Sequence, residues 1–563
     1  MTDTSRILPV LVVGAGPTGL AAALTLAQNG VPVRIIDKEE AFHATSRGAG
    51  IHPRSVEIFH FLGVLNDARK FHRDLPPFQS YKLPGGTEVL KRWHLFDKFE
   101  SSPDRPWDAM TISQYYTEGV FRDHLAKHGI HVELRTEPVS MEQDDEGVSV
   151  TLKRVDGDGK EQTESVRAAG KIEGLSDLSG ITRKQIGATF EGETKDADGS
   201  VYADAVIEGL SSELWHLWST PGKMLIGARP KLEPNAFHVT IFSRDFDPVE
   251  MVDQQKFVDF FHQTTGRKDL HFKEITALTY WKPKMRMVNK LQEGRIFIAG
   301  DAAHIHSPSG GQGLNTSIQD SFNLAWKLAL VYKGLASPDL LGTYPVERLP
   351  VIAQMLATTS NLYTHLIPKK EDSQATTVQD QDPKKAGFMQ WRNTALYQLD
   401  INYRWSPITV DAHGKDGLSE DDLKARAYEG YPGGDVRAGD RAPQAPALVG
   451  ADGLEKTLFD LLKPTYHTVL VFSPQGGAAE IVKAAQEYPV GTVHTVVLGK
   501  DAVPQPIDSA ESYHDKEGHA YRAYHVDGGE VTVVVVRPDG YVGAVVHDVD
   551  GLRTYLAKIF RVL

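Results

Sequence analysis

The sequence contains no cysteine in its 563 residues. This absence excludes disulfide bonds, thiolate metal sites and cysteine nucleophiles. Long hydrophobic runs are also absent, because none approaches the roughly 20 residues that a membrane-spanning helix needs. The first residues, Met1–Leu8, lack the basic segment and apolar core of a secretory signal. We therefore expect a cytoplasmic protein with no membrane span.

The sequence also has fewer positively charged than negatively charged residues. The chain has 61 Lys and Arg against 74 Asp and Glu, which gives a net charge of −13. Proteins that bind nucleic acid cluster Lys and Arg against the phosphates, so nucleic acid is not an expected partner. The hydrophobic share of 41% and the charged share of 24% are typical of globular protein. The length predicts several domains.

The N-terminal region predicts a strand, a glycine turn and a helix. Residues 7–13 form a short apolar run typical of a buried parallel strand, and residues 18–29 have a helical pattern. The turn between them, VVGAGPTGL, has the G-x-G-x-x-G spacing at Gly14, Gly16 and Gly19. In such a turn the first glycine bends the chain, the second lets a pyrophosphate approach, and the third lets helix and strand pack closely.

An acid follows the next predicted strand, as a dinucleotide-binding turn requires. Asp37 ends the apolar run 31–36 and can accept hydrogen bonds from ribose hydroxyls. The helix that begins at the turn directs free N–H groups and the positive end of its dipole toward an anion. The motif leaves FAD and NAD as alternatives, and a turn without a ligand is the other interpretation.

A second glycine-rich stretch, GDAAHIHSPSGGQGLN, runs from Gly300 to Asn315. An apolar run precedes it, and a helical pattern follows at 319–332. Its H-x-H pair, His304 and His306, suggests a metal, whereas its glycines suggest a phosphate or a flat ring. Because no third ligand of a suitable type is near, we favour hydrogen-bonding histidines and expect no metal.

Several motifs occur in the order found in one family. They are the glycine turn, TSRGAG with Arg47, PRSVEIFHFLG at 53–63, ISQ with Gln114, the stretch 300–315, AGDRAP at 438–443 and RPDGYVG at 537–543. With these motifs the chain resembles the FAD-dependent aromatic hydroxylases (group A flavoprotein monooxygenases). Its C-terminal part resembles the phenol hydroxylase branch of that family.

The resemblance implies that FAD is the dinucleotide. The residues it assigns to the N-terminal part of the FAD site are Gly14, Gly16, Pro17, Thr18, Gly19, Asp37 and Lys38, and it places Arg47 and Gln114 at the phosphates and ribityl chain. Asp301, after Gly300, would bind the ribityl or phosphate region, and Pro308 would lie beside the ring face where oxygen reacts. The backbone of Gly311, Gly313, Leu314 and Asn315 would follow the ring edge that carries N1 and O2, where N–H groups stabilise the anionic reduced flavin.

The resemblance and the strand and helix pattern together predict an α/β fold with a Rossmann-like FAD-binding domain. This domain is discontinuous (1–185 and 285–365), and an antiparallel sheet inserted at 186–284 would bind the substrate. Residues 366–435 are expected to be a helical or linker region. Residues 436–563 resemble a thioredoxin-like α/β domain, which without cysteine cannot perform thiol chemistry and which we expect to support packing or a homodimer.

The implied reaction is the hydroxylation of a small phenolic aromatic compound, as in secondary metabolism. NADPH or NADH, a transient co-substrate, would reduce FAD, and O₂ would then form a flavin C4a-hydroperoxide that transfers one oxygen atom. In the strand NAFHVTIF, His238 takes the place of a tyrosine that faces the substrate in phenol hydroxylase, and a histidine of near-neutral pKa is a suitable phenol base. Lys231 would replace an arginine of that enzyme, and His52 is an alternative base. For His238 a half-buried strand histidine is the competing interpretation, and Tyr280 and Trp281 would line either the pocket or the core.

One segment departs from the family pattern. The family carries G-A-D-G-x-x-S-x-x-R there, whereas EGLSDLSGITRK at 173–184 keeps Arg183 but has no Asp-Gly pair. Either Asp177 replaces that pair, or reduction by NAD(P)H is slow, or reduction follows another route. The altered segment leaves open a flavoprotein with impaired NAD(P)H turnover. Independently of it, a Baeyer–Villiger or epoxidising monooxygenase on the same fold, which needs no phenol deprotonation, is another alternative.

Overall fold

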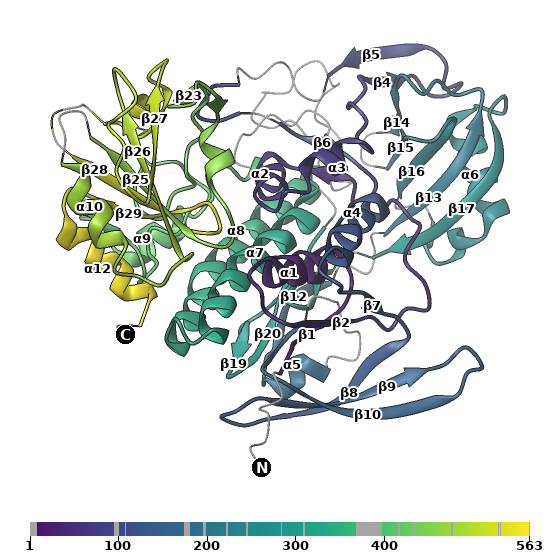
Figure 1. The fold of residues 1–563 in the computed structure, drawn as a ribbon. Coiled ribbons are helices and arrows are strands. Elements are labelled where there is room, and N and C mark those ends of the chain that lie inside the picture. Colours follow the sequence, from purple (N-terminus) through teal and green to yellow (C-terminus); the bar gives the residue numbers. More distant parts are fainter. Residues whose placement is uncertain are drawn as a thin grey trace.

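A computed structural model describes the chain except for residues 1–7, 95–100, 107, 174–180, 195–198, 221–222, 244–245, 283, 308–309, 367–396, 415–416, 432–433, 474–476, 527–528, 530 and 562–563. Three bodies of structure lie side by side (Figure 1): a central α/β layer, an antiparallel sheet on one side of it, and the C-terminal α/β domain on the other. None of the helices in the described residues is long and apolar enough to cross a membrane.

A six-stranded sheet forms the centre, in the order β19-β20-β11-β1-β2-β7. Its strands are β1 (Val10–Val13), β2 (Val33–Ile36), β7 (Val132–Glu133), β11 (Gly170–Glu173), β19 (Gln292–Glu293) and β20 (Ile296–Ile298). β1 pairs in parallel with both β2 and β11, and all four of its residues are buried. A parallel strand covered on both faces accounts for its unbroken apolar sequence.

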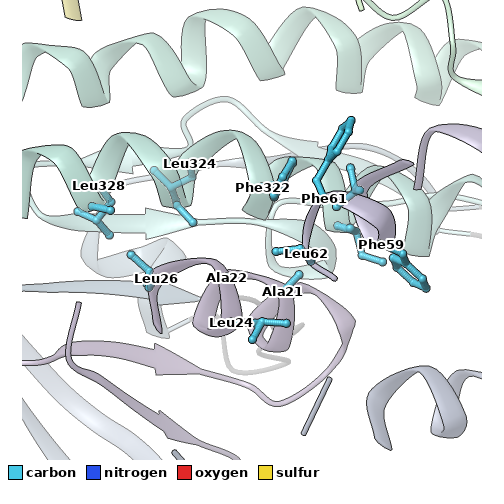
Figure 2. Close-up of a cluster of buried hydrophobic side chains, with 14 of the residues drawn as sticks. Ala21, Ala22, Leu24, Leu26, Phe59, Phe61, Leu62, Phe322, Leu324 and Leu328 are labelled. Atoms are coloured by element: carbon cyan, nitrogen blue, oxygen red, sulfur yellow. The ribbon is translucent and has the colours of Figure 1, made fainter. Parts of the chain in front are cut away.

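The helices beside this sheet bring the two glycine-rich stretches together. Helix α1 (Pro17–Gln28), α2 (Pro53–Phe61) and α7 (Gln312–Tyr332) share one buried hydrophobic cluster, to which α1 contributes alanines and leucines and α2 two phenylalanines (Figure 2). The rings of Phe61 and Phe322 stack with centroids 6.4 Å apart. The Ser321 hydroxyl donates a hydrogen bond to the Thr18 carbonyl oxygen at 2.7 Å. The first turns of α1 and α7 are therefore held next to each other.

A seven-stranded sheet has the order β17-β13-β16-β15-β14-β4-β5. Its strands are β4 (Phe78–Tyr81), β5 (Val89–Trp93), β13 (Gly199–Glu208), β14 (Trp215–Thr220), β15 (Met224–Pro230), β16 (Ala236–Ser243) and β17 (His271–Trp281). All neighbours are antiparallel except β14 and β4, which are parallel. β4 and β5 lie in the range that we assigned to the FAD-binding domain. The structure instead places the segment 78–93 in the seven-stranded sheet. Helix α6 (Gln254–Thr265) covers one face through Phe257 and Phe261.

Two three-stranded sheets, the two-stranded sheet of β3 and β6, and several short helices complete this half of the molecule. One sheet joins β8 (Thr136–Gln143), β9 (Val148–Val155) and β10 (Glu161–Ala168), and another joins β12 (Phe190–Thr194), β18 (Lys284–Val288) and β21 (His304–Ile305). The remaining elements are β3 (Gly50–Ile51), β6 (Met110–Thr111), α3 (Leu65–Arg69), α4 (Gln114–Ala126) and α5 (Ile181–Gln185). β21 lies at the start of the glycine-rich stretch, so its pairing with β18 helps to fix that stretch.

The C-terminal domain is built on an eight-stranded sheet in the order β22-β29-β28-β25-β26-β27-β23-β24. Its strands are β22 (Val410–Asp411), β23 (Leu448–Gly450), β24 (Glu455–Lys456), β25 (His467–Phe472), β26 (Val493–Gly499), β27 (Ala510–Asp515), β28 (Thr532–Val536) and β29 (Val542–Val546). Helices α10 (Ala478–Ala485) and α12 (Val549–Ile559) pack on it, and α9 (Glu420–Ala425) and α11 (His519–Ala523) are shorter. β22 and α9 come from the region 366–435, which we expected to be helical or a linker.

Buried charges join this domain to the central helices. Arg537 contacts Glu347 of α8 (Thr343–Leu366) at 2.7 Å and Asp539 at 2.6 Å. Lys327 of α7 contacts the same Glu347 at 2.7 Å, and the Trp326 indole N–H donates to Asp539 at 3.1 Å. Paired and hydrogen-bonded charges are the form in which ions are tolerated in a core. The C-terminal domain thus fixes α7, whose first turn faces the site described next.

Candidate active site

A single cavity of about 820 Å³ connects the glycine turn with the seven-stranded sheet. Its lining from the central layer includes Ala15, Gly16, Pro17, Thr18, Asp37, Arg47, His52, Gln114, Asp301, His306, Gly311, Gly313 and Leu314. Its lining from the sheet includes Tyr202, Trp215, Leu225, Gly227, Arg229, His238, Thr240, Phe242 and Trp281. A cavity of this size between two domains is the usual form of a ligand site.

The glycine turn has the geometry of a phosphate-binding loop. Gly14 has φ +100°, which favours glycine, and a Cβ on Gly19 would lie 1.9 Å from the Gly14 carbonyl oxygen. A Cβ on Gly16 would meet no atom within 4 Å, because this residue faces the open cavity. Gly16 is also the N-cap of α1 and supplies no capping side chain. The free N–H groups of the first turn therefore face the place where an anion would bind.

Asp37 fixes the turn as well as lining the cavity. Its carboxylate accepts hydrogen bonds from the backbone N–H of Ala15 at 2.7 Å and of Glu39 at 2.9 Å. The carboxylate oxygens can accept further bonds, so the expected role toward a ribose remains compatible with this geometry. Lys38, the next residue, is exposed and is not part of the cavity lining in the described residues.

The segment around Arg47 and Gln114 faces the same cavity. The Gln114 side-chain oxygen accepts from the Gly48 N–H at 3.1 Å, and its amide nitrogen donates to Glu118 at 2.8 Å. Asp301 faces the cavity. The surrounding protein separates its carboxyl from bulk water, and this desolvation raises the pKa of the carboxyl above the ordinary value. A Cβ on Gly300 would lie 2.4 Å from the Thr18 hydroxyl oxygen, so Gly300 allows close contact with α1.

The first turn of α7 forms a second uncapped helix start at the cavity. Gly311 is its N-cap, has φ +60° and provides no capping side chain, and Gly313 and Leu314 line the cavity. Asn315 is buried and fixes this turn: its side-chain oxygen accepts from the His52 N–H at 2.8 Å, and its nitrogen donates to the Gly311 carbonyl oxygen at 2.8 Å. Pro308 lies outside the described residues.

The two histidines of this loop, His304 and His306, make contacts within the protein. His304 is fully buried and contacts Asp320 at 2.8 Å, while Arg348 contacts the same carboxylate at 2.7 Å. Burial lowers the pKa of His306 to about 4, and its Nδ1 lies 2.6 Å from the Ser307 carbonyl oxygen. In the part of the chain that the structure describes, no group of three suitable side chains could hold a metal ion.

His52 is not placed as a base by this geometry. Its Nε2 lies 3.0 Å from the carbonyl oxygen of Gly310 and 3.1 Å from that of Gly311. Carbonyl oxygens only accept hydrogen bonds, so Nε2 carries the proton and donates it. Burial lowers the pKa of His52 to about 4, which keeps the ring neutral. His52 therefore supports the loop, contrary to the alternative role considered from the sequence.

His238 faces the cavity from the sheet. Cross-strand pairing places Asp204 of β13 opposite His238 of β16, and the His238 Nδ1 lies 2.8 Å from an Asp204 carboxylate oxygen. Burial lowers the pKa of His238, although the hydrogen bond with Asp204 opposes that shift. A neutral ring that donates Nδ1–H to Asp204 leaves Nε2 available as a proton acceptor.

Asp204 is the centre of this polar cluster. Its second oxygen accepts from the Ser46 N–H at 2.8 Å and from the Lys231 ammonium at 3.3 Å. Burial opposes ionisation, but the His238 and Lys231 contacts hold the pKa of Asp204 well below its ordinary value. Lys231 thus contacts Asp204, and it is not itself part of the described cavity lining.

Aromatic side chains surround the cluster. The Tyr202 ring stacks on His238 with centroids 5.8 Å apart and meets Phe242 edge-on at 6.2 Å. Trp281 lines the cavity, whereas its neighbour Tyr280 is 44% exposed and does not belong to the described lining. Asp204, Tyr202, Trp215 and Arg229 were not predicted from the sequence. An acid and an arginine within otherwise apolar strands were the available signal.

The altered segment 173–184 can be described only in part. Residues 174–180, with Asp177, lie outside the described residues. The Arg183 guanidinium donates to the Ala302 carbonyl oxygen at 3.2 Å and lies over the Phe190 ring, 4.6 Å from its centroid. Arg183 is thus attached to the chain beside Asp301.

Comparison with known proteins identifies the family. Residues 8–359 match the family described as "FAD binding domain", and residues 499–562 match "Phenol hydroxylase, C-terminal dimerisation domain". A flavin-dependent monooxygenase of Mycobacteroides abscessus is 30% identical, with 98% of this chain and 100% of the relative covered. Pentachlorophenol 4-monooxygenase of Sphingobium chlorophenolicum is 29% identical over 95% of this chain and 93% of the relative.

A solved structure shows the same fold. The aklavinone-11 hydroxylase, in a ternary complex with FAD and aklavinone, aligns with TM-score 0.77 and 23% identity over 100% of both chains. The chain therefore belongs to the FAD-binding aromatic hydroxylase family and is an FAD-dependent aromatic monooxygenase. The predicted family, fold class and cofactor are confirmed. Co-substrate use of NAD(P)H is typical of this family.

Proposed function

We propose that the protein hydroxylates a phenolic ring with NAD(P)H and O₂, and that His238 is the proton acceptor for the phenol. The observation that supports this most directly is the continuous cavity, which has uncapped helix starts at one end and the His238–Asp204 pair at the other. Named relatives that act on phenols, such as pentachlorophenol 4-monooxygenase, support the substrate class.

The residues of the central layer fit FAD. Gly16 and the first turn of α1 offer N–H groups to a pyrophosphate, and Arg47 supplies a cation on the same cavity. Asp301, on the same cavity, would hold the ribityl region, and the N–H groups in the first turn of α7 would stabilise the ring edge that becomes anionic on reduction. Bound FAD would supply the activation of O₂, and one atom of that O₂ would pass to the substrate while the other leaves as water.

The residues of the sheet orient the substrate and move its proton. Tyr202, Phe242 and Trp281 present apolar surface to an aromatic ring and exclude water. His238 accepts the phenolic proton at Nε2, and Asp204 stabilises the resulting imidazolium through Nδ1–H. The phenolate that forms is a more electron-rich ring than the phenol and is the better acceptor of an electrophilic oxygen.

The test is NAD(P)H oxidation by the FAD-loaded protein with a panel of phenols, with product and H₂O₂ analysis. We expect oxidation that phenols stimulate, together with ring-hydroxylated product. Lactone or epoxide products would instead support the Baeyer–Villiger or epoxidising function. The absence of NAD(P)H oxidation with any phenol, despite bound FAD, would support impaired turnover and contradict the proposal.

We also propose that the protein is a homodimer. The match of residues 499–562 to a domain named for dimerisation supports this. Light scattering after size-exclusion chromatography measures it: twice the chain mass of 62.1 kDa is expected, and a monomer at micromolar concentration would contradict it.

A further inference from the structure

Arg229 is a buried cation that faces the cavity and has no ion-paired carboxylate among the described residues. It lies on β15, is 7% exposed, and belongs to the cavity lining. Among the described residues, no carboxylate or carbonyl oxygen is within hydrogen-bond or ion-pair distance of its guanidinium. The contact that the structure does give it is with the Trp215 ring, whose centroid is 5.8 Å from the guanidinium carbon.

The register of the sheet places Arg229 beside the proposed base. Arg229 is directly opposite His238 on β16, and Asp204 is opposite His238 on the other side. The Asp204 carboxylate is already occupied by His238, Lys231 and the Ser46 N–H. Asp204, whose field favours the charged form of Arg229, is therefore committed to other partners.

Burial makes this cation costly in the absence of a ligand. Burial lowers the pKa of Arg229 to about 10, so that the guanidinium is still protonated at neutral pH. Buried charges in proteins are normally paired. An arginine that keeps its charge in a cavity without a protein partner is suited to an anionic ligand, which its planar fork can bind with two parallel hydrogen bonds.

The surrounding side chains specify the rest of that ligand. Trp215, which contacts Arg229, is part of a larger aromatic surface, because its ring stacks on Phe78 with centroids 4.5 Å apart. Gly227 lines the same cavity, and a Cβ there would lie 3.4 Å from the Trp215 indole nitrogen, so the glycine leaves room beside that ring. The arrangement combines a flat apolar surface with one cation, and that combination fits an aromatic anion.

We propose that Arg229 binds an ionised oxygen group of the substrate, and that the substrate is therefore an aromatic carboxylate or a ring bound as its phenolate. This inference rests on the proposed function and specifies its substrate. With a carboxylate, Arg229 would orient the ring while His238 takes a separate phenolic proton. With a phenolate, Arg229 would stabilise the charge that forms when His238 takes the proton.

Ligand binding to the oxidised, FAD-loaded protein tests this without turnover. The probes are 3-hydroxy-2-naphthoate against 3-hydroxy-2-naphthamide, which isolates the carboxylate, and 2-naphthol against 2-methoxynaphthalene, which isolates the phenol. Dissociation constants are measured by calorimetry for the wild type, Arg229→Met and Arg229→Lys. Lys273→Met is the control, because Lys273 is an exposed cation of the same sheet, paired with Glu208.

We expect Arg229→Met to weaken an ionisable probe by about tenfold or more and its neutral partner by less than about threefold. Arg229→Lys should keep part of the preference, and Lys273→Met should keep all of it. Loss of preference for the acid alone identifies a carboxylate, and loss for the naphthol alone identifies a phenolate. The proposal is overturned if no ionisable probe binds better than its neutral partner, or if Arg229→Met leaves the preference intact.

Thermal unfolding of the ligand-free variants distinguishes binding from support of the fold. No described residue is ion-paired with Arg229, so the unfolding midpoint of Arg229→Met should stay the same or rise. A clear fall in the midpoint would make Arg229 a structural cation and contradict the proposal. Binding that depends on Arg229 without any hydroxylated product would leave this inference standing and contradict the proposed function alone.

Discussion

His238 carries the proton in the proposed reaction, and its neighbours set the form in which it does so. Asp204 fixes the ring through Nδ1, and burial favours the neutral form that can accept a proton. Asp301 has the complementary position at the cofactor end of the same cavity. We propose that His238 acts in the oxygen-transfer chemistry and Asp301 in cofactor binding, so their substitutions should have different effects.

We expect His238→Phe to keep FAD but to reduce kcat for hydroxylation by about 10²–10⁴, the range of general acid–base catalysis. The acid limb of the wild-type kcat/KM profile should lie below pH 6.5, because burial lowers the pKa of His238 from that ordinary value. As the pH falls through the lowered pKa, the ring becomes protonated and the base is lost. Full activity in His238→Phe would remove His238 from the mechanism. An acid limb that is the same in this variant as in the wild type would do so as well.

We expect Asp301→Ala to lose FAD first. The carboxylate faces the cavity, and a hydrogen bond to a charged group contributes about 1.5–3 kcal/mol, so the FAD dissociation constant should rise about tenfold or more. Titration of apoprotein with FAD, followed by flavin fluorescence, measures this. An exposed acid far from the cavity, Asp259 of α6, provides a matched control as Asp259→Ala. Equal FAD affinity in the wild type and Asp301→Ala would contradict the assignment.

The two ends of the cavity differed in how far their residues could be predicted from the sequence. Gly16 and Gly311 belong to local motifs, so their positions follow from a few adjacent residues. Asp204, His238 and Arg229 come from three strands, and they meet because of strand register. Register depends on pairing over long sequence separations, and no local pattern specifies it. His238 was found through the family resemblance, whereas its partner Asp204 was not.

At the scale of elements, the first turns of α1 and α7 are the parts that we propose bind the cofactor. Both begin at glycines without a capping side chain, and the α1 start is tightly packed against β1. The strand–turn–helix unit was predictable because each of its signals is local. The contribution of β4 and β5 to the substrate sheet was not, because β4 pairs with β14, far away along the chain.

Two glycines of the α1 turn allow a test that separates folding from binding. In Gly19→Ala the new Cβ would lie 1.9 Å from the Gly14 carbonyl oxygen, so we expect a loss of about 1–3 kcal/mol in the free energy of unfolding. In Gly16→Ala the Cβ enters the open cavity, and φ −74° suits alanine, so the apoprotein should keep its stability but bind FAD at least about tenfold more weakly. Urea unfolding and FAD titration measure the two effects. Normal FAD affinity in Gly16→Ala would contradict the placement of the pyrophosphate.

At the scale of the whole molecule, the C-terminal domain is joined to the cofactor site through charge. Arg537 and Asp539 of this domain meet Glu347 and Lys327 in a buried cluster on α7 and α8. Helix α7 then leads directly to the turn that begins at Gly311. A domain without cysteine can therefore support the FAD site mechanically, even though it has no thiol chemistry of its own.

We expect Arg537→Met to cost about 3–5 kcal/mol, because it leaves Glu347 and Asp539 buried with less compensation. Burial opposes ionisation of Glu347, but Arg537 and Lys327 hold its pKa below the ordinary 4.5. That contribution to stability is present above about pH 4.5 and is lost as the pH falls. Urea unfolding at several pH values measures it. Arg553→Met, which removes an exposed pair with Glu487, should change the unfolding midpoint little, and equal effects of both variants would contradict the account.

The central claim is that this cavity holds FAD and a phenol together so that one oxygen atom passes to the ring. The most direct measurement uses the FAD-loaded protein with NAD(P)H, a phenol panel and ¹⁸O₂, followed by mass spectrometry of the products. The account predicts a hydroxylated phenol that carries one ¹⁸O atom, formed by the wild type and not by His238→Phe. Bound FAD with NAD(P)H oxidation that yields only H₂O₂ for every phenol, or product oxygen that comes from water, would contradict it.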